Sequence, residues 1–289
     1  MARKDNLAKA LWRLTRFEHA ILLGIASLAG IVIGSGSLPS GFYLLALVAL
    51  VPMLNEAASF SLNDILDIES DRANGKSDRP LVSGAVPLPL AWGIAISGYA
   101  ASIILASFIN PVAFAIAVAF AALSVLYNYA LKDFPLVGNA FIGLSMAIPF
   151  YFGAASAGVD PGLPVISVCL LAFVVGLGRE IAKTIQDVEG DVKARGSRNI
   201  AVVLGARASA IASAVCYFLA LPLSYLVYVY GIKPVPLSIF PVLASNALFF
   251  YLGFRIIASH GDAAFLKRAR NISLLALALG LAGIVAGAI

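Results

Sequence analysis

Apolar stretches of about 20 residues, the length that crosses about 30 Å of hydrocarbon as a helix, recur along this chain almost from end to end. Hydrophobic residues make up 61% of the chain and charged residues 12%, about half the charged fraction of an ordinary soluble domain. A soluble core cannot hide so many long apolar runs. We therefore expect an all-α, polytopic membrane protein.

Turn residues between the stretches, such as Asn110-Pro111 and Lys233-Pro234, divide the chain into nine expected spans. The first follows a basic arm, but more spans come after it and no clean cleavage context stands out, so we do not expect a cleaved signal peptide. The spans are expected at 17–36, 42–66, 86–108, 111–130, 136–156, 163–186, 206–230, 236–258 and 271–289.

Basic residues segregate to one side of the expected membrane. Of the 20 Lys and Arg, 19 fall in the N-terminal arm or near the connections after spans two, four, six and eight, and only Lys233 falls on the other side. The positive-inside rule makes the first side cytoplasmic. We therefore expect a multi-pass cell-membrane protein with its N-terminus inside and, because the number of spans is odd, its C-terminus outside.

Two acidic clusters stand where the second and sixth spans meet the cytoplasmic side. The first is Asn63-Asp64-Ile65-Leu66-Asp67 with Asp71, and the second is Asp187-Val188-Glu189-Gly190-Asp191. Carboxylates buried at a membrane edge without cations are costly. Two such edges facing one another suggest a bound divalent metal, and a metal beside a bilayer suggests a diphosphate with a lipid tail.

Helical spacing places each cluster in a stripe. At 100° per residue, Glu56, Asn63 and Asp67 lie within roughly 40° of one another, Asp64 lies at the edge, and Asp71 joins if the helix continues one turn. Glu180, Lys183, Asp187 and Asp191 form a similar stripe at the end of the sixth span. Polar stripes on membrane helices face the bundle interior, so the two stripes are expected to wall one cavity.

Oxygen ligands of this kind suit Mg²⁺, which takes one or two carboxylates together with phosphate oxygens and water. The alternative to a metal site is a charged loop that is solvated at the membrane surface. We adopt this interpretation for Glu69, Asp78 and Glu189. The expected metal ligands are Asn63, Asp64, Asp67, Asp71, Asp187 and Asp191.

Basic residues near the clusters complete the expected site. Arginine suits bidentate phosphate contacts and lysine acts as a point charge. Alternatively, a basic residue on this side follows only from the positive-inside rule and does not bind phosphate. We adopt this interpretation for Lys267, Arg268 and Arg270. The lone His19 has no metal partner at helical spacing and is not expected to be a ligand. The expected phosphate contacts are Arg72, Lys76, Arg79, Lys132, Lys183 and Arg198.

Tyr127, Asn128 and Tyr129 end the fourth span on the same side as the clusters. Interfacial tyrosine is common as a membrane anchor. The functional alternative is an aromatic face that stabilises an allylic cation. Tyr127, Asn128 and the nearby Lys132 are therefore candidates for catalysis and substrate binding.

The two clusters lie four spans apart and carry similar patterns. One is Asp67-x3-Asp71-x7-Arg79-x4-Gly84, and the other is Asp187-x3-Asp191-x6-Arg198-x6-Gly205. We expect one domain over residues 1–289, with spans one to four and five to eight as a possible repeat and cap loops at about 67–85 and 187–205. A P-loop, a GxGxxG nucleotide-binding unit and an HExxH motif are absent from the sequence, and nothing in it predicts a nucleic-acid partner.

Together these motifs resemble the UbiA-type intramembrane prenyltransferase superfamily. The family motif NDxxDxxxD is matched by Asn63, Asp64, Asp67 and Asp71, and its DxxxD motif is matched by Asp187 and Asp191. The resemblance implies nine helices around a central cavity, a cytoplasmic cap, and Mg²⁺-diphosphate binding at the matched residues. After the first motif, family members often carry DRxNxPxRPLPSG, whereas this chain has DRANGKSDRPLVSG.

The segment from Gly178 to Asp191 is most similar to archaeal digeranylgeranylglyceryl phosphate synthases, and its VEGD portion is also similar to chlorophyll synthases and homogentisate prenyltransferases. The resemblance implies transfer of a geranylgeranyl group from its diphosphate to geranylgeranylglyceryl phosphate, a lipophilic acceptor. Asp71 and Asp191 are the candidates for the base that takes the acceptor's proton. Prenylation of an aromatic acceptor is the alternative, and a secondary transporter is a remote one.

Overall fold

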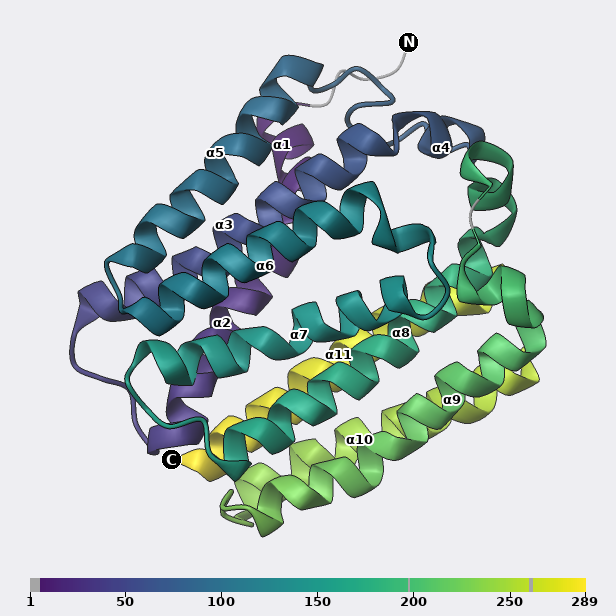
Figure 1. The fold of residues 1–289 in the computed structure, drawn as a ribbon. Coiled ribbons are helices and arrows are strands. Elements are labelled where there is room, and N and C mark those ends of the chain that lie inside the picture. Colours follow the sequence, from purple (N-terminus) through teal and green to yellow (C-terminus); the bar gives the residue numbers. More distant parts are fainter. Residues whose placement is uncertain (1–5, 197, 260–261) are drawn as a thin grey trace.

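The computed structural model describes residues 6–196, 198–259 and 262–289, without the side chains of residues 187, 189–191, 193–195 and 263. All the regular structure in these ranges is helical (Figure 1). The elements are α1 (Leu7–Thr15), α2 (Phe17–Ser35), α3 (Phe42–Leu66), α4 (Ile68–Ala73), α5 (Leu88–Ser107), α6 (Pro111–Tyr129), the 3-10 turn η1 (Leu131–Asp133), α7 (Val137–Ser156), α8 (Leu163–Arg195), α9 (Ile200–Val229), α10 (Pro236–Ala258) and α11 (Ala263–Ala288).

Nine of the described helices, α2, α3 and α5 to α11, are long and apolar enough to cross a membrane. The expected number of spans is thus confirmed. Local sequence explains several of the ends. Asn110 caps α6 by accepting a hydrogen bond from the Ala113 backbone N–H at 2.8 Å, and Pro111 supplies the first helical residue. Gly36 ends α2 in the left-handed region at φ 74°.

Apolar side chains cover the outside of the bundle, and small polar ones lie inside it. Phe42 is 83% exposed, whereas Ser102 and Ser213 are fully buried. The buried hydroxyls bond to neighbouring helices: Ser102 donates to the Val51 carbonyl at 3.0 Å, and Ser213 donates to the Gly178 carbonyl at 2.7 Å. This distribution is typical of helices in lipid, where packing and interhelical hydrogen bonds replace hydrophobic burial.

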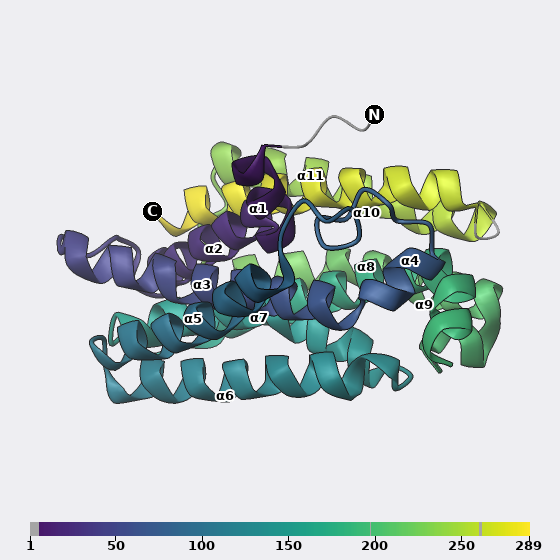
Figure 2. The same ribbon diagram turned by 90° about the horizontal axis from the view of Figure 1, so that it is seen from above.

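The long helices run along a common direction, and the C-terminus lies at the end of the bundle opposite α1 (Figure 1). The helix α2 packs against α3 and α7, α3 against α5, and α8 against α7 and α9, while α10 packs against α9 and α11. Viewed from above, α6 lies on one face and α11 on the opposite face (Figure 2). We call the end at which α2 and α7 begin and α3 and α6 end the polar end.

Glycine brings α2 and α7 into backbone contact. A Cβ added to Gly153 would lie 1.7 Å from the Ser27 carbonyl oxygen, and one added to Gly30 would lie 2.0 Å from that of Phe150. No side chain fits at such distances, so these two positions fix how closely the helices approach.

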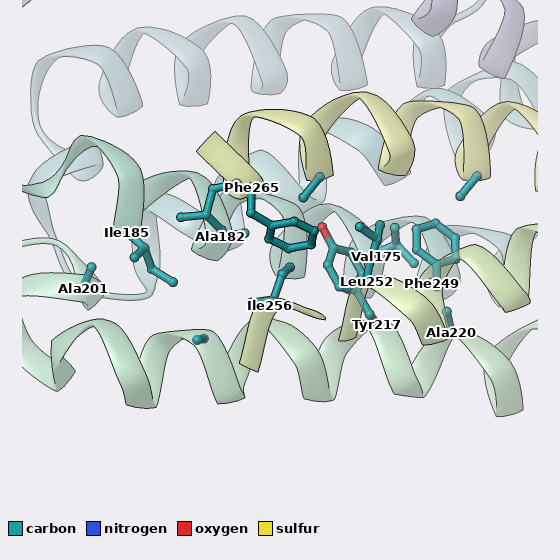
Figure 3. Close-up of a cluster of buried hydrophobic side chains, with 14 residues drawn as sticks. Val175, Ala182, Ile185, Ala201, Tyr217, Ala220, Phe249, Leu252, Ile256 and Phe265 are labelled. Carbon is teal, nitrogen blue, oxygen red and sulfur yellow. The ribbon is translucent and has the colours of Figure 1, made fainter. Parts of the chain in front are cut away.

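Buried side chains from α8, α9, α10 and α11 form a second rigid block (Figure 3). The ring of Tyr217 stacks on that of Phe249 with centroids 5.5 Å apart. Phe265 from α11 and Ile256 from α10 join the same cluster, which extends past them to Ile185 and Ala201 (Figure 3). This block holds the second half of the chain in a fixed position beside α2 and α7.

The polar end contains more helix than expected. Part of the basic N-terminal arm, Leu7–Thr15, forms α1, and Arg16 separates α1 from α2. The expected cap loop at about 67–85 contains α4. The helix α8 continues to Arg195, so the second acidic cluster lies on a helix, and α9 starts at Ile200 with a break in helical geometry at Gly205. The internal repeat stays a prediction.

Candidate active site

One cavity of about 250 Å³ runs between α2, α3, α6, α7, α8, α10 and α11. At the polar end its wall includes Asn63, Asn128 and Lys183. Farther along, the wall is mainly apolar, with Ser224, Ser245 and Asn246 as polar members. Along α8 it reaches from Lys183 back to Val168, a length of about 22 Å at 1.5 Å per residue. A cavity of this length fits a molecule with a charged head and a long apolar tail.

The first wall of the polar end is formed where α3 ends. Asn63 lines the cavity, and its amide donates a hydrogen bond to Asp67 at 2.9 Å. Lys132, on the turn after α6, donates to the other oxygen of Asp67 at 2.6 Å. The Lys132 side chain is only 9% exposed, so this ion pair is largely removed from water. The structure thus brings three predicted residues together from segments 65 positions apart.

Asp64 lies behind this wall and is 2% exposed. It accepts hydrogen bonds from Arg16 at 3.1 Å and from Arg79 at 3.0 Å. The Arg16 guanidinium also lies 4.1 Å from the centre of the Phe60 ring, a cation–π contact. Through these hydrogen bonds, Asp64 connects α3 to Arg16, between α1 and α2, and to Arg79, in the segment after α4.

Arg16 itself occupies an unusual backbone position. Its φ of 44° is in the left-handed region, which is costly for a residue with a side chain. Burial lowers the pKa of its guanidinium from the ordinary value, and the nearby charge of Asp64 acts in the opposite direction. An arginine stays protonated in proteins, so Arg16 retains its charge at the cavity wall.

Asp71 lies on α4 and is buried. Its carboxylate is 3.4 Å from the Lys76 ammonium and 3.6 Å from the Nε of Arg79. The short helix α4 packs against α8, the helix that carries Asp187 and Asp191. The side chains of Asp187 and Asp191 lie outside the described part, so their expected roles stay predictions.

Aromatic residues line the cavity beside the first wall. The ring of Tyr127 stacks on Phe141 with centroids 4.6 Å apart, and Phe141 stacks in turn on Phe120 at 5.6 Å. Asn128 is buried and donates to the Ser124 carbonyl at 3.0 Å. The Tyr127 ring is thus fixed at the cavity surface.

The other predicted phosphate contacts lie in different places. Lys183 lines the cavity and pairs with Glu180 at 2.8 Å. Lys76 and Arg79 lie in the segment after α4 and pair with Asp71 and Asp64 behind the first wall. Arg72 and Arg198 are exposed, and neither lines the cavity.

Ser59 and Ser124 are polar groups of the cavity wall that were not predicted, and Tyr99 supports them from behind. Tyr99 and Ser124 share a hydrogen bond at 2.7 Å, and Ser124 donates to Ser59 at 2.8 Å. Ser59 and Glu56 line the cavity together with Ser124. The helical spacing of Glu56, Ser59 and Asn63 on α3 could have placed Ser59 on the stripe. Nothing in the sequence could have shown that Tyr99 approaches from α5.

The donor set of the polar end fits magnesium. Among the residues that the structure describes, no group of three His, Cys, Asp or Glu is gathered as a metal would need. The described carboxylates of the first motif instead carry Arg and Lys partners. Their carboxylate oxygens and the amide oxygen of Asn63 are the ligand type that Mg²⁺ prefers. Asn63 lines the cavity, and the carboxylates lie beside it or behind it at the polar end.

A membrane bundle around one long cavity, with carboxylates and cations at a single end, defines a class of intramembrane protein for substrates with an anionic head and an apolar tail. The chain belongs to the UbiA prenyltransferase family, which matches residues 23–277.

Two relatives extend over nearly the whole chain. The digeranylgeranylglyceryl phosphate synthase of Archaeoglobus fulgidus is 33% identical over 97% of this chain and 95% of its own length. A solved structure from work on digeranylgeranylglyceryl phosphate synthase in membranes is 28% identical, with a TM-score of 0.75 over 98% of this chain and 99% of that one.

A further solved structure supports the fold. It is a UbiA homolog from Archaeoglobus fulgidus bound to GPP and Mg²⁺, 22% identical, with a TM-score of 0.67 over 95% of this chain and 99% of that one. At this identity the likeness concerns the fold alone.

Proposed function

We propose that this protein transfers a geranylgeranyl group from its diphosphate to the free hydroxyl of geranylgeranylglyceryl phosphate, in the synthesis of archaeal ether lipids. The observation that carries the proposal is the long cavity, with ion-paired carboxylates at its polar end and about 22 Å of wall along α8. The digeranylgeranylglyceryl phosphate synthase of Archaeoglobus fulgidus, 33% identical, supports the choice of acceptor.

The donor diphosphate lies at the first wall, within reach of Asn63, Lys132 and Arg16, with its prenyl tail along the apolar part of the cavity. The C1–O bond breaks, and the diphosphate leaves with the electron pair. The Tyr127 face stabilises positive charge at C1. The apolar wall excludes water, which would otherwise capture the cation.

The acceptor hydroxyl oxygen bonds to C1, and its proton passes to a carboxylate, for which Asp71 and Asp191 are the candidates. Bound Mg²⁺ supplies neutralisation of the leaving diphosphate. The residues proposed to hold it are Asn63, Asp64, Asp67, Asp71, Asp187 and Asp191. Phosphate contacts from Lys76, Arg79 and Lys183, and from the exposed Arg72 and Arg198, belong to the same proposal.

The test is incubation of the purified protein with labelled geranylgeranyl diphosphate, Mg²⁺ and either geranylgeranylglyceryl phosphate or 4-hydroxybenzoate, followed by identification of the product. We expect a digeranylgeranyl ether product from the first acceptor only, and none in excess EDTA. Product from 4-hydroxybenzoate alone would instead assign an aromatic acceptor, and full activity in EDTA would contradict the metal requirement.

A further inference from the structure

A second group of basic residues lines the cavity on the side away from the first wall. Arg179 of α8, Arg270 of α11 and His19 of α2 all contribute to the cavity surface. The three helices pack against one another, so these residues share one corner of the polar end. We call these three residues the cationic corner.

Within the described part of the chain, the corner lacks the partners that its polar atoms need. The Nε of Arg179 and the Nδ1 of His19 are buried and have no hydrogen-bond partner there. Buried polar groups of folded proteins are almost always hydrogen-bonded, and an unpaired buried charge is costly. Donors left in this state, facing a cavity, indicate a ligand with acceptor atoms.

Acidic groups near the corner do not neutralise it in the described structure. Glu180 is engaged by Lys183 at 2.8 Å. Glu18 lies 3.8 Å from His19 but is 55% exposed. Tyr217 lies close to Arg179 but is a neutral phenol. At the first wall, by contrast, Arg16, Arg79 and Lys132 already face aspartates. In the described part of the chain, the two arginines of the corner therefore form no ion pair, unlike these three cations.

Depth separates the corner from the predicted metal ligands of α8. Arg179 precedes Asp187 by eight residues, or about 12 Å along the helix at 1.5 Å per residue. An anion held by Arg179 thus lies about two helical turns deeper in the bundle than those aspartates, which favours a group other than the diphosphate. The only other anionic group in the proposed reaction is the phosphate of the acceptor.

We propose that the cationic corner binds the phosphate monoester of the acceptor. The proposal rests on the proposed function and specifies where that function recognises its substrate. The guanidinium groups of Arg179 and Arg270 donate to the phosphate oxygens, a pairing that suits arginine, and the His19 imidazole adds an N–H donor. The acceptor's free hydroxyl then points toward the first wall, where C1 of the donor lies. This assigns binding roles to Arg270 and His19, for which the sequence had suggested none.

The test compares two acceptors, geranylgeranylglyceryl phosphate and geranylgeranylglycerol, which lacks the phosphate. For the wild-type protein and Arg270→Gln, kcat/KM is measured with each acceptor, and KM is measured for geranylgeranyl diphosphate. We expect Arg270→Gln to lower the preference for the phosphorylated acceptor by about tenfold, the loss of one charge-assisted contact, through a higher acceptor KM. Because Arg270 is exposed, its replacement should not impair folding. Arg179→Gln should act more strongly.

The matched control is Arg268→Gln, the same replacement two residues earlier on α11, where the side chain is exposed and does not line the cavity. The control should keep the wild-type preference. The proposal would be overturned if both Arg270→Gln and Arg179→Gln kept the wild-type preference for the phosphorylated acceptor. It would also be overturned if kcat/KM fell equally for the two acceptors, or if only the KM for the donor rose.

A binding measurement without donor or Mg²⁺ separates recognition from chemistry. Geranylgeranylglyceryl phosphate should raise the melting temperature of the wild-type protein and of Arg268→Gln, but raise that of Arg270→Gln less. Equal stabilisation of all three would contradict the subsite. If the wild-type protein neither binds nor uses this acceptor, the proposed function itself fails, an outcome distinct from failure of the subsite alone.

Discussion

Asp64 and Asp67 belong to one sequence motif, yet the structure gives them different surroundings. Asp64 is 2% exposed and accepts hydrogen bonds from Arg16 and Arg79. Asp67 stands at the wall beside the cavity-lining Asn63, with Lys132 as its cation. We infer that Asp64 contributes strongly to stability, whereas Asp67 contributes mainly to the reaction.

Asp67→Ala is expected to lower transfer by about 100-fold or more, because the variant loses both the partner that positions Lys132 and a proposed ligand of Mg²⁺. The variant should still elute as a folded protein in size-exclusion chromatography. The measurement is product formation from labelled donor at saturating Mg²⁺. Activity near the wild-type level would contradict the role assigned to this carboxylate.

Asp64→Ala is expected to lower stability by about 3–5 kcal/mol, because removing one partner of a buried ion pair leaves its guanidinium groups uncompensated. The melting temperature in detergent should therefore fall clearly further than in Asp67→Ala. If the two variants melt together, the division of roles within the motif is wrong.

At the level of helices, the contact between α2 and α7 fixes one side of the cavity. Gly30 and Gly153 allow the two backbones to touch. Ala26 of α2 and Phe150 of α7 both line the cavity close to this contact. A wider spacing of the two helices would therefore change the space available to a prenyl tail.

Gly153→Ala is expected to destabilise the protein by about 1–3 kcal/mol, because its new methyl group would overlap the Ser27 carbonyl. The measurement is thermal unfolding in detergent. Gly93→Ala is the matched control: it lies within α5, and an added Cβ there meets nothing within 4 Å. Equal melting temperatures for the two variants would contradict the close contact.

At the scale of the whole molecule, charge and chain ends define two unlike faces. Lys233 lies beside the C-terminus: its backbone N–H donates to the Gly287 carbonyl at 2.8 Å, and its ammonium donates to Ile289 at 2.9 Å. Lys267 lies at the other end, near the start of α11. From the positive-inside rule we predict that the Lys267 end lies in the cytoplasm.

Cysteine labelling tests this orientation. Lys233→Cys and Lys267→Cys are made separately in a Cys169→Ala, Cys216→Ala background, and intact cells are treated with a membrane-impermeant maleimide. We expect Lys233→Cys to react from outside and Lys267→Cys to react only after lysis. The reverse pattern would place the catalytic end outside the cell.

Much of the fold could be predicted because each membrane span is determined locally. The span expected at 42–66 and the one expected at 236–258 match α3 and α10 to the residue. The spacing of Asn63 and Asp67 likewise predicted one wall of the site. The helical continuation of α8 to Arg195 was not predicted, since a charged segment can be a loop or a helix that projects from the membrane.

The sequence by itself determined nine spans, the side on which charge gathers and the identity of the acidic motif, because hydropathy and helical period act over neighbouring residues. Only the tertiary structure decided that Lys132 meets Asp67, that Arg16 and Arg79 enclose Asp64, and that Arg179 and Arg270 share one corner of the cavity. These contacts join distant helices, and their positions depend on how closely whole helices pack, which no local pattern encodes.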